Sequence, residues 1–189
     1  TLQAGKISYK KYWELSLEPK IFDEHVAIEG IRNHLDRAVR MRLVSDVSLG
    51  AFLSGGIDSS AIVSTMRRYV SGPLKTFSVG FQEKTYDETS YARLVANQLG
   101  TKHFEIQCKA VMLKDNLDKL AWHADGLVAD PAILPLFLVS QLARQEVTVA
   151  LSGDGGDELF VGYPTFIANQ YLERYQKLPA FFRKPLTKI

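Results

Sequence analysis

Cysteine is nearly absent from this chain: Cys108 is the single cysteine among 189 residues. One thiol excludes an internal disulfide framework and a zinc site built on four thiolates, and it fits a reducing compartment, so we expect a cytoplasmic protein. No run of 18 apolar residues occurs, which excludes a membrane-spanning helix. Residues 1–11 also lack the charged-then-apolar pattern of a secretory signal.

A strong charge of either sign is missing too. The 23 basic and 21 acidic residues give a formal net charge of +2, and the basic residues are scattered along the chain. Charge therefore gives no reason to expect a nucleic-acid partner. A composition that is 46% hydrophobic and 23% charged is that of an ordinary globular protein, which excludes disorder, collagen and coiled coil. The length predicts one domain, or one domain with a short extension.

Short apolar runs alternate with helical patterns from residue 24 onward. We expect strands over 47–53, 75–81, 102–107 and 147–151, and helices over 24–42, 59–70, 88–99, 111–123 and 131–145. Asp130 is the expected N-cap of the last helix, with Pro131 at its first position. Strands that alternate with helices predict an α/β fold of three layers, with a parallel sheet covered on both faces. Ligands bind such sheets at the carboxyl ends of the strands.

The first residues do not share this pattern. Residues 1–23 are mostly polar and carry Tyr9, Tyr12 and Trp13. We expect a linker or extended arm that docks these aromatic side chains on the domain. Because the sequence begins without Met and ends at Ile189, we also expect a fragment of a longer protein.

One glycine-rich loop follows the first buried strand and has the sequence S-G-G-I-D-S-S over residues 54–60. Glycine lets a bulky anion approach the backbone, and the following helix offers free N–H groups and the positive end of its dipole. The loop is not a Walker A motif, because G-x-x-x-x-G-K-[ST] is absent. Asp58 would repel phosphate unless a cation lay between them, so we expect it to hold Mg²⁺. The alternative is a tight turn in which Asp or Ser caps the helix.

A second loop, Ser152–Phe160, follows the last expected strand and holds three glycines and three acids within residues 152–158. Acids at this density need a cation or solvent. We expect Asp157 to hold the same Mg²⁺ as Asp58, and Glu158 to cap the next helix or pair with a basic residue. A solvated acidic turn is the alternative.

The first loop resembles the PP-loop of the N-type ATP pyrophosphatases, which cleave ATP between the α and β phosphates and adenylate a substrate. The second loop reads S-G-x-G-x-D-E-x-F-x-G-Y, and the two together resemble the synthetase domain of glutamine-hydrolysing asparagine synthetases. Other matching segments are Phe77–Phe81, Asp87–Glu88 and Tyr12–Trp13. GMP synthetases and NAD synthetases share the first loop but, as families, not the second.

The resemblance implies a PP-loop ATP pyrophosphatase fold, similar to the adenine nucleotide α-hydrolases. Residues 1–23 would be the linker from an N-terminal glutaminase domain, and 24–189 an ATP-binding domain that is incomplete at its C-terminus. A carboxylate, expected to be aspartate, would be adenylated by Mg²⁺ and ATP, and ammonia from glutamine would then displace AMP. The isolated chain would not complete catalysis, because a later lysine-bearing region is missing.

Residue roles follow from the same resemblance. Asp154 occupies a position tied to the acyl-adenylate intermediate, and Asp58 and Asp157 would hold Mg²⁺. The positions implied for the nucleotide are Leu53, Ser54, Gly55, Gly56, Asp58, Ser59, Val79, Ser152 and Gly153.

Two alternatives to this function stay open. The family often reads D-E-P-x-x-D-x-S-x-x-P-T before its long helix, whereas the segment Asp125–Leu136 lacks the hydroxyls. A related ligase could therefore adenylate a different carboxylate, as a β-lactam synthetase-like or peptide-modifying enzyme would. The chain could instead be a nucleotide-binding module without catalysis, although such a sensor has little need for both Asp58 and Asp157.

Overall fold

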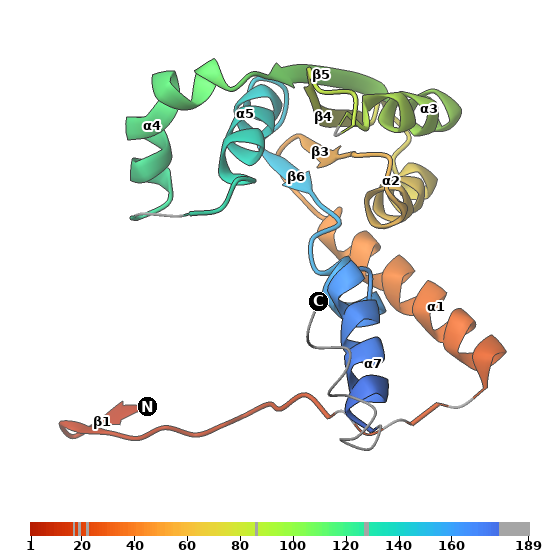
Figure 1. The fold of residues 1–189 in the computed structure, drawn as a ribbon, viewed down its shortest axis with the longest axis vertical. Helices are drawn as coiled ribbons and strands as arrows, with labels where there is room; N and C mark the ends of the chain where they lie inside the picture. Colours follow the sequence, from red (N-terminus) through yellow and green to blue (C-terminus); the bar gives the residue numbers. More distant parts are fainter. Residues whose placement is uncertain (17, 19, 22, 86, 127–128, 178–189) are drawn as a thin grey trace.

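Four parallel strands form the central sheet of this protein (Figure 1). The computed structural model describes residues 1–189 except 17, 19, 22, 86, 127–128 and 178–189. The strand order is β5-β4-β3-β6, which places β3 and β4 in the centre. The strands are β3 (Leu49–Phe52), β4 (Lys75–Phe81), β5 (Lys102–Cys108) and β6 (Val149–Leu151).

Helices cover both faces of the sheet, which confirms the predicted three-layer α/β arrangement. On one face lie α2 (Ile57–Tyr69) and α3 (Thr89–Leu99), and α1 (Glu24–Arg42) packs outside α2. On the other face lies α5 (Ile133–Arg144), with α4 (Val111–His123) against it. The short α6 (Gly156–Phe160) and then α7 (Pro164–Gln176) follow β6.

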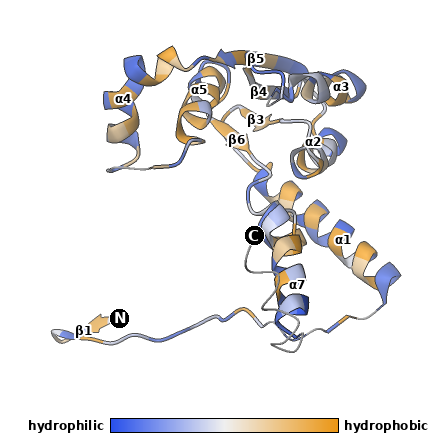
Figure 2. Ribbon diagram, in the orientation of Figure 1, coloured by the Kyte–Doolittle hydropathy of each residue, from blue (hydrophilic) through white to orange (hydrophobic). Residues whose placement is uncertain are grey.

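The core is divided by the sheet, as a three-layer fold requires. On the α2 and α3 side, Leu53, Val63 and Met66 are fully buried. On the α5 side, Phe77 is fully buried and stacks on Phe104 with ring centroids 5.4 Å apart. Burying each such side chain contributes roughly 1.5–3 kcal/mol to folding. Figure 2 shows the consequence: α5, which faces the sheet, is largely hydrophobic, while α1 alternates between hydrophobic and hydrophilic bands.

Element boundaries differ from the sequence prediction in places. α2 begins at Ile57, two residues before the expected start, so Ser59 lies within its first turn. α5 begins at Ile133, and Ala132 rather than Asp130 is its N-cap. The Asp130 carboxylate instead accepts a hydrogen bond from the Ala132 N–H at 2.8 Å, in the turn that leads into the helix. The strands predicted over 47–53 and 147–151 are shorter in the structure, where they form β3 and β6.

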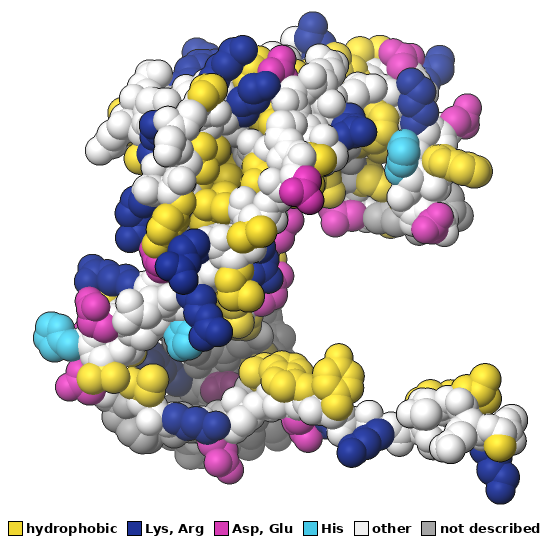
Figure 3. Space-filling view, turned by 180° about the vertical axis from the view of Figure 1, so that it is seen from behind, with side chains coloured by type: hydrophobic (Ala, Val, Ile, Leu, Met, Phe, Trp, Pro, Cys, Tyr) yellow, Lys and Arg dark blue, Asp and Glu magenta, His cyan; other side chains and the backbone are white. Residues whose placement is uncertain are grey.

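The N-terminal segment departs most from expectation. A short antiparallel pair, β1 (Leu2–Gln3) and β2 (Lys6–Ile7), turns through Ala4 and Gly5, which both have positive φ. The chain then runs away from the sheet (Figure 1), and hydrophobic side chains stand out along it (Figure 3). Tyr12 is 96% exposed, and Tyr9 and Trp13 are exposed as well, so the predicted docking of these aromatic side chains is wrong.

Helices long and apolar enough to cross a membrane do not occur among the described residues.

Candidate functional site

The two glycine-rich loops lie beside each other because their strands are neighbours. β3 and β6 pair in parallel, with Ala51 opposite Leu151, so the loop after each strand leaves the same edge of the sheet. Contact between the loops is close: a Cβ on Gly153 would lie 2.8 Å from the backbone nitrogen of Ser59. A glycine at this position therefore lets the second loop rest on the first turn of α2.

The first loop is shaped by one glycine in a conformation that other residues avoid. Gly55 has a φ of 88°, and a Cβ there would lie 2.5 Å from the backbone of Tyr91 and Ala92 in α3. Gly56 caps α2 without any side-chain hydrogen bond to the helix. The expected alternative, in which Asp or Ser caps the helix, is therefore not what the structure shows. The N–H groups of this first turn are the donors that a phosphate needs.

The serines of this loop hold its shape. The Ser54 and Ser59 hydroxyl oxygens are 3.0 Å apart, and the Ser54 hydroxyl accepts a hydrogen bond from the Gly56 N–H at 3.2 Å. The buried Ser59 hydroxyl also donates to the Gly56 carbonyl at 3.3 Å. These hydrogen bonds hold the loop in shape and use both hydroxyls within it. Contact of either hydroxyl with pyrophosphate therefore stays a prediction.

Asp58 reaches the second loop. Its carboxylate lies against Gly156, the residue before Asp157, while the Asp157 carboxylate lies against Gly162. In the described parts of the chain, no three His, Cys, Asp or Glu side chains gather as a metal site. Two carboxylates on adjoining loops do not make a protein cage, but they suit Mg²⁺, which is commonly bound by one or two carboxylates together with substrate phosphates.

The second loop concentrates negative charge. The Asp154 carboxylate accepts a hydrogen bond from the Ser152 hydroxyl at 2.7 Å and is exposed. Glu158 accepts one from the Tyr163 hydroxyl at 2.8 Å, and Tyr163 rather than Glu158 is the N-cap of α7. Among the described residues no salt bridge joins Glu158 to a basic side chain. This hydrogen bond, burial, and the charges of Glu158, Asp157 and Asp154 raise the pKa of Tyr163. A polyphosphate could approach such a loop only with a cation between them.

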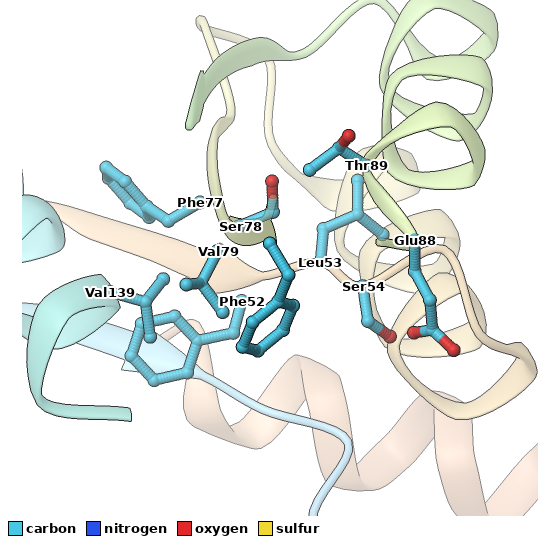
Figure 4. A pocket seen from close by; sticks show the side chains of 10 residues that line it. Phe52, Leu53, Ser54, Phe77, Ser78, Val79, Glu88, Thr89 and Val139 are labelled. Carbon is cyan, nitrogen blue, oxygen red and sulfur yellow. The ribbon is translucent and has the colours of Figure 1, made fainter. Parts of the chain in front are cut away.

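A cavity of about 170 Å³ opens between the ends of β3 and β4. Three residues predicted to bind nucleotide, Leu53, Ser54 and Val79, line it together. Figure 4 shows Phe52, Val79 and Val139 on one side of it and the oxygens of Ser54 and Glu88 on the other. None of the second-loop residues is among the described residues that line this cavity.

Sequence reasoning missed most of the cavity wall. The lining residues that it did not assign to the site are Phe52, Phe77, Ser78, Phe81, Glu88, Thr89 and Val139. Their signal was weak, because they come from four separate elements and none belongs to a glycine-rich loop. Phe77, Ser78, Phe81 and Glu88 lie in two of the segments that resemble the family, but that resemblance gave them no role in the site.

Asp87 joins two parts of this wall. Its carboxylate accepts hydrogen bonds from the Phe81 N–H at 3.3 Å and from the Thr89 hydroxyl at 3.0 Å. It thus ties the end of β4 to the start of α3. Burial raises the pKa of Asp87, but these hydrogen bonds outweigh burial and hold the pKa below its ordinary value. The carboxylate is therefore ionised as it holds the wall together.

Comparisons with known proteins identify a family. Residues 30–188 match the family described as "Asparagine synthase". The chain is 43% identical to a putative asparagine synthetase [glutamine-hydrolyzing] 2 of Methanocaldococcus jannaschii, covering 94% of the chain and 35% of that protein. It is 37% identical to asparagine synthetase [glutamine-hydrolyzing] 1 of Bacillus subtilis, covering 98% of the chain and 29% of that protein.

Two other matches have lower sequence identity. The chain is 31% identical to the amidase chyE of Penicillium rubens, covering 90% of the chain and 28% of that protein. Among solved structures, an NH3-dependent NAD synthetase of Campylobacter jejuni matches with a TM-score of 0.45 and 17% identity, covering 75% of the chain and 61% of that structure. The chain spans about a third of the length of the first two curated relatives.

Proposed function

Because this chain belongs to the asparagine synthase family, we propose that it forms the ATP-binding part of an amide-forming ligase. The observation that carries the proposal is the contact between the two loops, in which Gly153 rests on the first turn of α2 and Gly156 adjoins Asp58. The first loop offers N–H groups and the Asp58 carboxylate, and the second loop offers further carboxylates. This is the pair of surfaces that a polyphosphate with its cation requires.

The proposed reaction has two steps. A substrate carboxylate, for which we propose aspartate, attacks the α-phosphorus of ATP, and the bond to the β-phosphate breaks to release pyrophosphate. Ammonia from glutamine then attacks the carbonyl carbon of the acyl-AMP, AMP leaves, and a proton is lost to give the amide. The chain needs no nucleophile of its own, so its contribution is to position reactants and stabilise charge.

The residues divide this work by position. We assign the base to the cavity with Leu53 and Val79, and the pyrophosphate to Ser54, Gly55, Gly56, Asp58 and Ser59. Ser152 and Gly153 would contact the nucleotide from the neighbouring loop. Asp154 is proposed to act on the acyl-adenylate, for which its exposed carboxylate is accessible.

Mg²⁺ is proposed to be held by Asp58 and Asp157, and when bound it neutralises phosphate charge. The donor set fits because both groups are carboxylates on adjoining loops. The carboxylates would orient the polyphosphate by way of that ion and keep it from being repelled by Asp154.

For the complete protein we propose a glutaminase domain that supplies ammonia, with residues 1–23 as the linker to it and 24–189 as the ATP-binding domain. The extended course of the first residues supports this, because Tyr9, Tyr12 and Trp13 have no cover within the described chain. We place the reaction in the cytoplasm, since a single cysteine fits a reducing compartment.

The segment Asp125–Leu136 lacks the hydroxyls of the family pattern. The identity of the carboxylate that is adenylated is therefore the part of the proposal to test. Residues 127–128 of that segment lie outside the described residues. The test is pyrophosphate–ATP exchange by the full-length gene product across a panel of carboxylic acids. Exchange that requires aspartate supports the proposal. Exchange with another acid only would keep the ligase and change its substrate, and nucleotide binding without any exchange would favour a non-catalytic module.

A further inference from the structure

A chain of polar side chains lies between the sheet and α3, on a face that is usually apolar in a parallel sheet. In the pairing of β4 with β5, Thr76 lies opposite His103 and Ser78 opposite Glu105. Thr76 is fully buried and Ser78 is 5% exposed. Polar groups buried this deeply must be hydrogen-bonded, and both hydroxyls have His103 as a partner.

The bonds form a continuous path from the surface to the cavity. Arg93 of α3 binds Glu105 through two hydrogen bonds, of 2.7 and 2.5 Å. The Nε2 atom of His103 lies 3.3 Å from a Glu105 carboxylate oxygen and 3.2 Å from the Ser78 hydroxyl. Ser78 lines the cavity to which we assign the nucleotide base.

The direction of each hydrogen bond follows from the carboxylate. An ionised Glu105 only accepts, so the His103 atom that faces it, Nε2, must carry the proton. The other ring nitrogen, Nδ1, is then an acceptor, and the Thr76 hydroxyl at 2.9 Å donates to it. Thr101, 2.8 Å from Thr76, completes the order by donating to the Thr76 oxygen. Burial lowers the pKa of His103, which favours this neutral tautomer.

This order leaves one donor free at the cavity wall. The one proton on Nε2 of His103 has two acceptors, a Glu105 carboxylate oxygen at 3.3 Å and the Ser78 oxygen at 3.2 Å, and is shared between them. Ser78 is thus an acceptor towards His103, and its own hydroxyl proton is not used in that bond. We propose that His103 is a positioning residue that fixes the Ser78 hydroxyl as a hydrogen-bond donor to an acceptor atom of the purine base. The inference rests on the proposed function, because it requires ATP in this cavity. His103 itself does not line the cavity and acts only through Ser78.

Two substitutions at position 103 separate the two ring nitrogens. In His103→Gln the side-chain amide can keep a donor near the place of Nε2. In His103→Asn a shorter amide can serve Thr76 near the place of Nδ1 but cannot reach Ser78. We expect the dissociation constant for ATP, measured calorimetrically on the full-length gene product with Mg²⁺, to rise about fivefold in Ser78→Ala and in His103→Asn and to stay near wild type in His103→Gln.

A double variant distinguishes positioning from a purely structural role. If His103 acts through Ser78, the variant Ser78→Ala/His103→Asn should bind ATP within about twofold of Ser78→Ala alone, because the shared bond is already lost. Two effects that multiply would overturn the proposal. Ser78→Ala removes one buried hydroxyl and keeps the inference falsifiable even if His103→Asn does not fold.

Base analogues identify the contact. Among ATP analogues in which one ring nitrogen is replaced by CH, one should bind the wild type more weakly than ATP and should bind Ser78→Ala as ATP does. Equal discrimination by wild type and Ser78→Ala against every analogue would overturn the inference while leaving the proposed function intact. A wild-type protein that does not bind ATP at all would overturn both.

Discussion

The carboxylate of Asp58 lies against the backbone of Gly156, so closely that a Cβ on that glycine would overlap the carboxyl group. This single contact fixes the position of the proposed metal-binding acid of the first loop by means of the second. Gly156 itself has ordinary helical geometry, so space and not backbone strain is what requires glycine there.

The first prediction follows from this contact. In Gly156→Ala the new methyl group displaces the flexible Asp58 side chain and leaves the backbone unchanged. We expect the Mg²⁺ concentration that gives half-maximal pyrophosphate–ATP exchange to rise about tenfold, as for other residues that orient a metal ligand. The free energy of unfolding should change little. An unchanged Mg²⁺ requirement would contradict the role given to this contact.

Loss of the carboxylate charge is a second test. Asp58→Asn keeps the shape of the side chain but removes its negative charge, so exchange should fall at least about 100-fold, the effect of removing a preorganised charge partner. Asp118→Asn makes the same chemical change at an exposed position of α4 and serves as the control. Equal exchange rates in the two variants would remove Asp58 from the metal site.

Alanine substitutions at two glycines, one between the loops and one in α1, test the packing of the loops. In Gly153→Ala the Cβ meets the Ser59 backbone nitrogen at 2.8 Å, and backbone cannot move as a side chain can. We expect a loss of about 1–3 kcal/mol in the free energy of unfolding by urea. Gly30→Ala, within α1 and with open space around the new methyl group, should instead gain about 0.5–1 kcal/mol. A stable Gly153→Ala variant would show that the loops are not in contact.

The fourth prediction concerns pH. Burial holds the pKa of His103 below its ordinary value of 6.5, despite the nearby charge of Glu105. The unfolded chain therefore takes up a proton at a higher pH than the folded chain, and the free energy of unfolding falls as the pH decreases through that value. We expect urea unfolding to show this loss between about pH 7.5 and about pH 5.5 in wild type.

The variant His103→Gln cannot take up that proton, so its stability should vary less over the same range. Asp87 and Glu146 do not interfere, because their pKa values are lowered from ordinary values of 3.8 and 4.5, and their contribution is lost only at more acidic pH. Parallel pH profiles of wild type and variant would contradict the assignment.

A fifth prediction tests the start of α1. The Asp23 carboxylate accepts a hydrogen bond from the Val26 N–H at 3.0 Å, the arrangement of an N-cap. Asp23→Ala should lower the free energy of unfolding by about 1 kcal/mol, whereas Asp23→Ser should keep most of it. If the two variants are equally stable, the helix does not depend on this cap.

Local patterns in the sequence determined the elements and the two loops. The helix from Glu24 to Arg42 and the end of α3 at Gly100, which has a φ of 62°, lie where apolar spacing and turn chemistry predict them. These features depend on residues within a few positions of each other. The parallel, two-sided sheet follows as well, because strands that alternate with helices leave little other choice.

Only the tertiary structure decided which distant residues meet. The neighbouring of β3 and β6 brings Asp58 to Gly156, and the pairing of β4 with β5 places His103 between Ser78 and Glu105. The hydrogen bond from Tyr163 to Glu158 was likewise not predicted, and the docking of Tyr12 was predicted wrongly. The reason is physical: periodicity records which face of an element is buried, whereas the identity of a contact depends on strand order and register, which no short stretch of sequence contains.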